Sequence, residues 1–472
     1  MIAMKFGGSS VGSGERMVNV AKIIQSYISK KPVVVISALQ GVTDTLLSLS
    51  DDFLHRRKEE GQKKLNQVGE KHFEIIREYI KDTKRASEIR KKIEELMTQL
   101  EEVAHGVYLL REFSPKSLAL VSSFGERLSV PLLSGILQEM GTPAKDFDAR
   151  QLVSTDDEFL SAGVDMKTTC SQFKKYVFPV WKKGVVPVIT GFIGSCREGL
   201  TTTLGRGGSD YSGAIVGACF DAEEIWIWTD VSGIYSADPR IVPNAKGLSS
   251  VSYEEASEMS YFGAKVIHPK TMMPAVMKKI PIRIKNTFAP KDSGTLISKK
   301  TMTKGHPVQI VTAIKKLDLV SVQGSGMIGV PSISARIFST VDRAKVHLFM
   351  YSQASSGYNM CLVTGNQESH RLKEMLECEF SHELKIGALD QIGILSSMSI
   401  VSVIGSGMRG TPGIAGAIFA ALGDHSLNIM AIAQGSSQLN ISMVIDESDA
   451  DRAVKILHDA VILKHFENKV GS

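Results

Sequence analysis

Cysteine is scarce in this chain of 472 residues, and no two cysteines are close in sequence. The five are Cys170, Cys196, Cys219, Cys361 and Cys378, and none belongs to a C-x-x-C pair. An odd number of scattered cysteines indicates neither a disulfide framework nor a zinc site. This usage is typical of a reducing cytosol, so we predict a cytoplasmic protein without a dedicated metal site.

Long apolar runs and a strong excess of charge are also missing. No apolar run approaches the roughly 18 residues that cross a bilayer, and glycines interrupt the N-terminus where a signal peptide has its apolar core. The formal net charge is only +5, with basic and acidic residues interleaved. Because binding of nucleic acid requires a concentrated basic surface, we predict neither a membrane partner nor a nucleic-acid partner.

What is present is the composition of a globular protein, with 43% hydrophobic and 22% charged residues. In the first 300 residues, short β-branched runs alternate with helical patterns, and the expected strands are 32–37, 184–190, 224–230 and 280–286. Several are apolar almost throughout, as strands covered on both faces by helices are. The pattern predicts an α/β domain with a mainly parallel sheet, whose ligands bind beyond the carboxyl ends of the strands.

Residues 51–111 have a different, highly charged character. One apolar stripe recurs there at spacings of four and three residues: Ile89, Ile93, Leu96, Leu100 and Val103. This spacing predicts a helical hairpin that packs against the domain by one face. We assign it no chemistry.

The last 160 residues contain an internal repeat. VSVQGSGMIGVPSISARIF begins at Val320, and IVSVIGSGMRGTPGIAGAIF begins at Ile400. Equivalent residues, such as Gln353 and Gln434, lie 81 positions apart. Repeats of this kind mark tandem structural units, and each copy predicts a strand, a GSGM turn, a helix and two further strands.

The repeat sets the expected domain limits. A first domain covers 1–300, and the polar stretch 298–307 is the expected linker. Two small βαββ modules follow at 315–392 and 398–461, and residues 462–472 are a candidate for completing the first of them.

The N-terminal sequence MIAMKFGGSS places Lys5 at the end of an apolar run and before Gly7 and Gly8. A glycine pair after a strand marks a close approach of the backbone or a positive φ, and such a turn presents N–H groups to an anion. Because the lysine precedes the glycines, this is not a Walker A loop. Two interpretations are open: an anion-binding turn, or an N-terminal edge strand with a surface lysine.

Later clusters carry a stronger signal. LGRGGSDYSG, at 204–213, places Arg206, Ser209 and Asp210 on a loop that its glycines make tight. An arginine fork recognises a carboxylate, and a helix beginning near Ser209 directs its positive end to the same place. The alternative is that Asp210 is a plain N-cap and Arg206 a surface residue.

Two further clusters are weaker. IWTDVSGIYSADPR, at 227–240, fits a nucleotide-holding loop after a buried strand, although Asp-Pro also marks an ordinary turn. Glu126, in SSFGERLS, is interpreted from the residues alone as a carboxylate in the first turn of a helix.

Six motifs, in this order, resemble those of the aspartokinases of the amino-acid kinase family: KFGGSSV, SALQGVTDTL, SSFGERLS, LGRGGSDYSG, WTDVSGIYSADPR and YFGAKVIHP. The tandem repeat resembles the paired ACT regulatory domains of these enzymes. The resemblance covers essentially the whole chain and implies a three-layer α/β kinase domain followed by two α+β ACT domains. It favours the monofunctional form, since no room is left for a fused homoserine dehydrogenase.

The resemblance implies transfer of the γ-phosphoryl group of ATP, with Mg²⁺, to the β-carboxylate of L-aspartate, the first step towards lysine, threonine and methionine. That carboxylate is already ionised at pH 7, so the chemistry depends on positioning and positive charge rather than on a general base. Carried over by motif, Lys5 and Asp210 are catalytic. The implied aspartate pocket is Ser37, Thr43, Glu126, Arg206 and Ser209. The implied nucleotide site is Lys5, Gly7, Gly8, Ser9, Thr229, Asp230, Tyr235, Arg240, Lys265 and Val266.

The same resemblance makes the repeat an amino-acid sensor, with effector-binding residues Met327, Gln353, Met408, Asn428, Gln434 and Asn440. A glutamine amide donates and accepts at once, which suits a ligand with a hydroxyl group. QASS and QGSS are similar to the sensor segments of threonine-inhibited aspartokinases, whereas lysine sensors more often have an aspartate at the positions of His347 and Asn428. We therefore favour threonine over lysine. Ala354 departs from the pattern, which makes the first copy the weaker candidate.

Exposed strands of small βαββ units pair readily between chains, so we expect a homodimer or homotetramer through the ACT domains. Acetylglutamate kinases, glutamate 5-kinases and UMP kinases are the alternatives within the fold, but they lack such a repeat. An inactive amino-acid sensor is the alternative from another class. The joint presence of Lys5, Arg206 and Asp210 argues against it.

Overall fold

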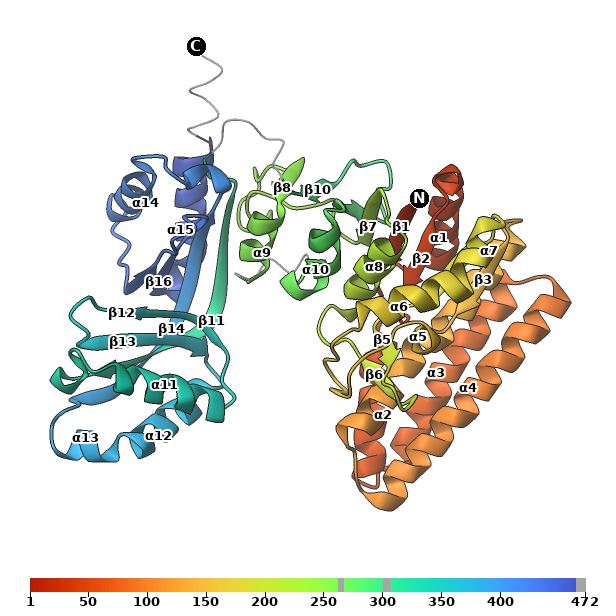
Figure 1. Cartoon of the computed structure of the whole chain (residues 1–472), viewed down its shortest axis with the longest axis horizontal. Coiled ribbons are helices and arrows are strands. Elements are labelled where there is room, and N and C mark those ends of the chain that lie inside the picture. The colour runs from red at the N-terminus through yellow and green to blue at the C-terminus, as the bar shows by residue number, and fades with distance from the viewer. Residues whose placement is uncertain (262–266, 300–306, 464–472) are drawn as a thin grey trace, which may run out of the picture. The chain divides into compact units, whose positions relative to one another are not determined.

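The computed structural model describes residues 1–261, 267–299 and 307–463. The chain divides into two compact units (Figure 1). The first contains Met1–Ile234, Ser249–Tyr253 and Ile267–Thr301, and the second contains Tyr235–Leu248, Glu254–Val266 and Met302–Ser472. Within the described ranges, no helix has both the length and the apolar character needed to span a bilayer.

The first unit is built on an eight-stranded sheet with the order β3-β4-β2-β1-β7-β9-β10-β8. Its strands are β1 (Ile2–Phe6), β2 (Val33–Ile36), β3 (Ala144–Phe147), β4 (Val186–Thr190), β7 (Glu224–Thr229), β8 (Ser250–Ser252), β9 (Ile282–Asn286) and β10 (Thr295–Ser298). Neighbouring strands are parallel except β9 and β10. The short strands β5 (Ile193–Ser195) and β6 (Thr201–Thr203) form a separate antiparallel pair. The four predicted strands are confirmed as β2, β4, β7 and β9.

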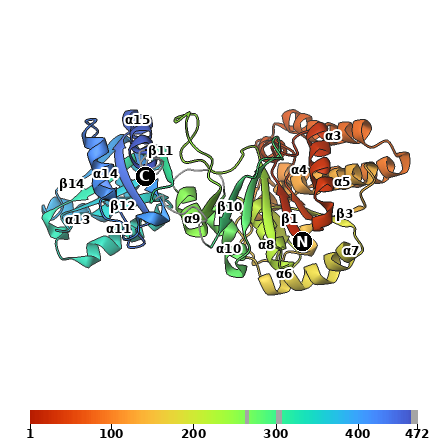
Figure 2. The same ribbon diagram turned by 90° about the horizontal axis from the view of Figure 1, so that it is seen from above.

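Helices cover both faces of this sheet (Figure 2). One face carries α6 (Met166–Gln172), α8 (Gly208–Cys219) and α10 (Pro269–Lys278), and α7 (Phe178–Lys182) flanks β4. The other face carries α1 (Gly14–Ser26) and α5 (Pro115–Glu139). Every residue of β1, β2 and β4 is buried, as the nearly continuous apolar runs predicted. The three-layer α/β architecture is therefore confirmed.

The strand that contains Lys5 is not at an edge. β1 pairs with β2 on one side and with β7 on the other. The edge-strand interpretation of the N-terminus is therefore wrong, and Lys5 is a buried lysine rather than a surface one.

The charged stretch is helical, as predicted. α2 (Val42–Leu54), α3 (Lys58–Tyr79) and α4 (Thr83–Leu110) lead into α5, and α3 packs against α4. Of the predicted stripe, Ile89, Ile93 and Leu100 are buried, while Leu96 and Val103 pack against the same core.

The second unit contains a six-stranded antiparallel sheet with the order β12-β13-β11-β14-β16-β15. Its strands are β11 (Ile310–Gln323), β12 (Leu348–Gln353), β13 (Asn359–Gly365), β14 (Gln391–Ile404), β15 (Ala431–Ala433) and β16 (Asn440–Asp446). Its helices are α9 (Tyr253–Tyr261), which enters this unit at Glu254, with α11 (Pro331–Arg343), α12 (Ser369–Glu379), α13 (Ser381–Lys385), α14 (Ile414–Gly423) and α15 (Ala450–Leu457).

The two repeat copies share their first strands. The first part of β11, Ile310–Ile314, pairs with the last part of β14, Ile400–Ile404, while the rest of β11 pairs with β13 and with the start of β14. Val311 consequently packs in the core of the second copy, and Ile392 packs in the core of the first. Residues 300–306 of the expected linker lie outside the described residues, and the domain limits stay predictions.

One cysteine pair corrects the sequence analysis. Cys170 on α6 and Cys219 at the end of α8 form a disulfide, with their Cα atoms 4.8 Å apart. The positions of the cysteines in the sequence did not predict this disulfide, because the two residues are separated by 49 positions. They meet only because α6 packs on α8. Cys196, Cys361 and Cys378 are free thiols.

Candidate active site

A cavity of about 450 Å³ in the first unit is lined by more than half of the residues predicted for catalysis, aspartate binding and nucleotide binding. It opens beyond the carboxyl ends of β1 and β2 and at the beginning of α8, which is where ligands bind in sheets of this type. The predicted residues that line it are Lys5, Gly8, Ser9, Ser37, Thr43, Glu126, Arg206, Ser209 and Asp210.

Lys5 reaches the cavity from the penultimate position of β1. Its Nζ forms an ion pair with Oδ1 of Asp210 at 2.6 Å, and the two side chains are only 9% and 17% exposed. Gly7 is the first residue after β1, and its N–H donates to the carbonyl of Trp228 at 3.2 Å. A Cβ on Gly8 would lie 3.3 Å from the carbonyl of Ala38, so the turns after β1 and β2 approach closely only because this residue is glycine.

Asp210 and Ser209 lie in the first turn of α8, and the preceding loop is shaped by glycine. Gly205 and Gly207 have φ of 77° and 70°, a region that favours glycine. Arg206 lies between them, is exposed, and lines the cavity. The N-terminal end of α8 adds unpaired N–H groups and a partial positive charge to the same space. Asp210 is therefore not a plain N-cap, because its carboxylate pairs with Lys5.

Glu126 supplies a buried acid to the same cavity. It lies in the middle of α5, so the interpretation as a first-turn carboxylate is wrong. The side chain is nearly inaccessible, and among the described residues Oε2 has no hydrogen-bond partner. Burial raises the pKa of Glu126 to about 8, although hydrogen bonds with backbone groups and the charge of Lys5 oppose the shift. Burial thus favours the neutral acid, and a cation placed against it would favour the ionised form.

The cavity also contains residues that sequence reasoning missed. Gln40 and Asp44 come from the segment that follows β2, within a motif quoted only for its resemblance. Phe192, after β4, has φ of 69°, which is uncommon for a residue with a side chain. A Cβ on Gly208 would lie 2.6 Å from its ring, so Phe192 and the start of α8 fit closely. No sequence signal identified Phe192.

The predicted nucleotide residues do not all fall in this cavity. Thr229 ends β7 beside the turn of Gly7, and its hydroxyl donates to Asp230 at 3.1 Å. Tyr235 and Arg240 belong to the second unit, where Arg240 is 89% exposed and pairs with Asp238 at 2.6 Å. Lys265 and Val266 lie outside the described residues.

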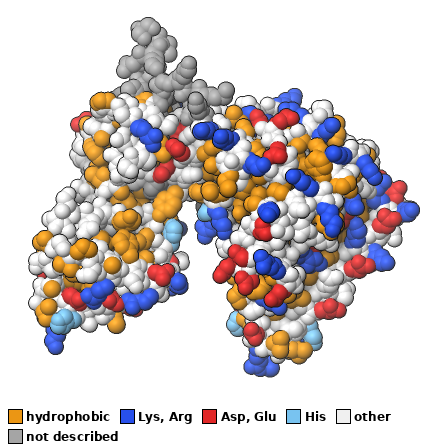
Figure 3. Space-filling view, in the orientation of Figure 1, with side chains coloured by type: hydrophobic (Ala, Val, Ile, Leu, Met, Phe, Trp, Pro, Cys, Tyr) orange, Lys and Arg blue, Asp and Glu red, His pale blue; other side chains and the backbone are white. Residues whose placement is uncertain are grey.

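The predicted effector residues lie in the second unit in different environments. Gln434 and Asn440 line a cavity of about 570 Å³ together with Ser352, which precedes Gln353 on β12. This cavity lies where the two terminal strands of the sheet face each other, and Ser352 Oγ donates to the carbonyl of Ile432 at 3.0 Å. Figure 3 shows apolar side chains gathered on the face of this unit that it displays. Tyr351 and Ile432, which line the cavity, are exposed. Met327 and Met408 are buried in the cores, and Asn428 is exposed.

Helix α9 contacts the second repeat copy beside these residues. Glu255 accepts a hydrogen bond from the backbone N–H of Ser406, in the GSGM turn, at 2.7 Å. Glu258 accepts one from the side-chain amide of Asn440, and burial raises the pKa of Glu258. Asn440 thus joins the cavity to α9.

Comparison with protein families gives two matches along the chain. Residues 1–286 match the amino acid kinase family, and residues 320–380 and 401–461 match the ACT domain.

Two curated relatives come from Arabidopsis thaliana. The chain is 34% identical over 483 residues to bifunctional aspartokinase/homoserine dehydrogenase 1, chloroplastic, and the alignment covers 99% of this chain and 52% of that protein. This chain spans about half the length of the bifunctional relatives it matches. It is 31% identical over 463 residues to aspartokinase 3, chloroplastic, covering 97% of this chain and 81% of that protein.

Among solved structures, E. coli aspartokinase III in complex with aspartate and ADP is similar over nearly the whole chain. The TM-score is 0.82 at 29% identity, and the match covers 98% of this chain and 99% of that chain. A structure of the same protein in complex with lysine and aspartate matches with a TM-score of 0.81.

Proposed function

The chain belongs to the aspartokinase family, with an amino acid kinase domain and tandem ACT domains, and on that premise we propose that it is an ATP-dependent aspartate kinase. The reaction transfers the γ-phosphoryl group of ATP to the β-carboxylate of L-aspartate and gives 4-phospho-L-aspartate. The complex of the E. coli relative with aspartate and ADP supports this choice of substrates.

The observation that carries the proposal is the joint presence of three charged features in one cavity. The Lys5–Asp210 ion pair, the exposed guanidinium of Arg206 and the buried carboxyl of Glu126 all line the same space. These charges complement an amino-acid substrate that carries two carboxylates and an ammonium group, together with a phosphoryl donor.

The chemistry requires positive charge rather than a base. An oxygen of the ionised β-carboxylate attacks the γ-phosphorus, and the bond to the bridging oxygen of ADP breaks without any proton transfer. The barrier is largely the repulsion between a carboxylate and phosphate oxygens. Lys5, held by Asp210, and the N–H groups of Gly8, of Ser9 and of the α8 N-terminus stabilise the transferring group. The N–H of Gly7 is not available for this role, because it donates to the carbonyl of Trp228.

We assign substrate recognition to the charged and hydroxyl side chains that line the cavity. Arg206 binds the α-carboxylate of aspartate with its planar fork. Glu126 binds the ammonium group, and Ser37, Thr43 and Ser209 add hydroxyl contacts. The carboxyl of Glu126 must lose its proton for this role, which couples aspartate binding to pH.

The nucleotide enters as its magnesium complex. Phosphate oxygens and water would supply most ligands of such a magnesium ion, and Asp210, which lines the cavity, is a carboxylate that fits the remainder. Among the described residues there is no cluster of three or more histidine, cysteine, aspartate or glutamate side chains of the kind that holds a resident metal.

An assay of ADP formation with MgATP and L-aspartate tests the proposal. We expect turnover with L-aspartate and none with N-acetyl-L-glutamate, L-glutamate or UMP. Lys5→Ala should lower kcat by about 10²–10³-fold, because it removes a charge directed at the transferring group. Lys22→Ala, on the exposed face of α1, is the matched control and should leave kcat unchanged.

Absence of turnover with every acceptor would favour the inactive-sensor alternative. Normal turnover of Lys5→Ala would remove the catalytic role of the lysine but not the aspartate specificity, so the two parts of the proposal are tested separately.

We also propose that threonine is the effector and that Gln434 contributes to its site. The cavity of Gln434 and Asn440 presents amides and hydroxyls, which suit a ligand with a hydroxyl group. The E. coli relative was solved with lysine, so lysine is the competing effector. Formation of a homodimer or homotetramer through the ACT domains and a cytoplasmic location stay predictions.

A further inference from the structure

A second cavity, of about 400 Å³, lies in the first unit and shares no lining residue with the cavity of Lys5. It is lined by α4, α5, β3 and the segment that follows β3, and Thr190 at the end of β4 contributes to it. Its residues are Lys92, Glu95, Leu96, Gln99, Arg127, Val130, Pro131, Asp146, Phe147, Asp148, Gln151 and Thr190. The proposed kinase chemistry uses none of them.

A buried arginine is the main feature of this cavity. The side chain of Arg127 is only 6% exposed. Its Nη2 donates to Oε1 of Gln99 at 2.9 Å, and its guanidinium stacks over the ring of Phe124 at 4.4 Å. Nε and Nη1 have no hydrogen-bond partner among the described residues. A buried cation with unused donors is costly unless a ligand completes it.

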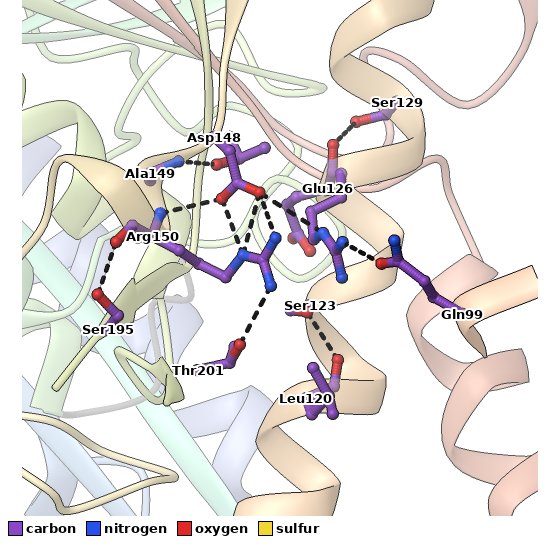
Figure 4. A network of polar contacts seen from close by, with 12 residues as sticks. Gln99, Leu120, Ser123, Glu126, Ser129, Asp148, Ala149, Arg150, Ser195 and Thr201 are labelled. Atoms are coloured by element: carbon purple, nitrogen blue, oxygen red, sulfur yellow. Dashed lines mark hydrogen bonds and ion pairs between the residues drawn. The ribbon is translucent and has the colours of Figure 1, made fainter. Parts of the chain in front are cut away.

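The nearest carboxylate does not complete it, because Asp148 is engaged by a second arginine. Both oxygens of Asp148 accept hydrogen bonds from Arg150, at 2.7–3.1 Å (Figure 4). Nε of Arg127 lies 3.5 Å from Oδ2 of Asp148. Two arginines thus face one carboxylate. Burial, followed by repulsion from Arg150, lowers the pKa of Arg127 to about 10, with Asp148 opposing the shift.

The remaining walls carry the opposite charge and an apolar surface. Asp146 pairs with Lys92 at 2.9 Å, and the exposed Glu95 lies beside them on α4. The cavity that contains this acidic rim and Arg127 is also lined by four apolar side chains: Leu96, Val130, Pro131 and Phe147. The cavity thus combines a buried positive end, an acidic rim and an apolar wall.

From this arrangement we propose that the cavity binds a free α-amino acid with an apolar side chain. Its carboxylate accepts hydrogen bonds from Nη1 and from the remaining N–H of Nη2 of Arg127. Its ammonium group faces the exposed Glu95 and shares Asp146 with Lys92, and its side chain packs on Leu96 and Phe147. The basic and acidic side chains that line the cavity, together with Arg150, carry equal numbers of positive and negative charges. A zwitterion therefore suits the lining, because a simple anion would complement only Arg127 and a simple cation only the acidic rim.

A purely structural role for Arg127 is the competing explanation. In that case the arginine only joins α5 to the segment after β3 through Asp148, and the cavity takes no specific ligand. The two explanations differ in whether the full-length protein binds an amino acid at this position, a question that is independent of kinase turnover.

Calorimetric titration of the full-length protein with L-leucine, L-methionine and L-phenylalanine tests the proposal. We expect saturable binding of at least one of them, with one site per chain. For the amino acid that binds, the analogues lacking the ammonium group or the carboxylate should bind at least about tenfold more weakly. If none of the three binds, the proposal is overturned.

Two variants locate the site. Leu96→Trp fills the cavity from α4 without touching a charge, and Arg127→Lys keeps the charge but loses the planar fork. Both should raise the Kd at least about tenfold. Leu109→Trp, on the exposed surface of the same helix, is the matched control and should bind like wild type.

Leu96→Trp serves as the decisive variant if Arg127→Lys fails to fold, as judged by circular dichroism. Unchanged binding by a folded Leu96→Trp overturns the proposal, because the ligand then binds elsewhere. If saturating L-aspartate or L-threonine abolishes binding of the apolar amino acid that binds, the proposal is also overturned, because the cavity shares no residue with the sites proposed for those ligands.

Discussion

At the scale of single residues, two neighbours on α5 illustrate how much depends on helix geometry. Glu126 and Arg127 are adjacent and both buried, yet they line different cavities. Successive residues on a helix point about 100° apart, so one helix can supply an acid to one cavity and a base to the next. The motif SSFGERLS contains both residues, but the sequence alone does not show which side chain lines which cavity.

We predict that Glu126 makes aspartate binding depend on pH. Its pKa of about 8 keeps it protonated at neutral pH in the free protein, whereas an ammonium group binds the ionised form. The KM for L-aspartate should therefore fall as the pH rises from 6 to 8, by up to about tenfold per pH unit. Steady-state kinetics of wild type and Glu126→Gln check this, and the variant should show a higher KM without this dependence.

The same shift predicts a change in stability of known sign. The pKa of Glu126 is higher in the folded protein than its ordinary value of 4.5, so ionisation opposes folding. The protonated carboxyl of Glu126 therefore contributes to the free energy of unfolding. That contribution is fully present below pH 4.5 and is lost as the pH rises to about 8. Glu126→Gln should therefore gain stability relative to wild type over that range. Equal pH dependence of both proteins in chemical unfolding would contradict the burial argument.

Arg206 carries a second residue-scale prediction. Arg206→Ala should raise the KM for L-aspartate by about tenfold or more and leave the KM for ATP nearly unchanged, because the guanidinium binds the substrate carboxylate. Arg197→Ala, an exposed arginine outside the cavity, is the control. Equal increases in both KM values would mean that Arg206 binds phosphate instead.

At the scale of elements, glycines determine how closely α8 approaches the sheet. A Cβ on Gly217 would lie 2.4 Å from Cγ1 of Ile225 on β7, and a Cβ on Gly213 would lie 3.0 Å from Cβ of Lys5 on β1. Glycine therefore allows the helix that carries Asp210 to lie directly on the strand that carries Lys5. The position of the ion pair depends on this close packing.

We predict that Gly217→Ala destabilises the first unit by about 1–3 kcal/mol, because Ile225 is fully buried and cannot move aside. Gly106→Ala, on α4, is the matched control: nothing lies within 4 Å of the added Cβ, so helix propensity should make it neutral or stabilising by up to about 1 kcal/mol. Chemical unfolding monitored by circular dichroism measures both. Equal free energies of unfolding for Gly217→Ala and wild type would show that α8 shifts to accommodate the added methyl group.

The elements differ in how far the sequence predicted them. β2, β4, β7 and β9 were predictable because strands covered on both faces are continuous apolar runs. The sequence did not predict the disulfide between Cys170 and Cys219, nor that β11 and β14 each belong to both repeat copies. Both features depend on contacts between distant segments. The stripe on α4 correctly predicted which face is buried. It carried no information about the cavity that α4 forms with Arg127.

At the scale of the whole molecule, the two repeat copies form one body. Because β11 and β14 run through both copies, each core contains a strand segment from the other copy. The 81-residue offset predicted the elements of each copy but not this exchange. A ligand that moves strands in one copy therefore acts on a sheet that both copies share.

We predict that threonine regulates turnover through the second repeat copy. Threonine at millimolar concentration should inhibit turnover, and Gln434→Ala should raise the concentration for half-inhibition by about tenfold, because it removes an amide that hydrogen-bonds the ligand. Gln353→Ala should have a smaller effect, since Gln353 does not line the cavity of Gln434. Gln391→Ala, exposed at the start of β14, is the control. Inhibition by lysine alone would contradict the choice of threonine, and a larger effect of Gln353→Ala would assign the sensor to the first copy.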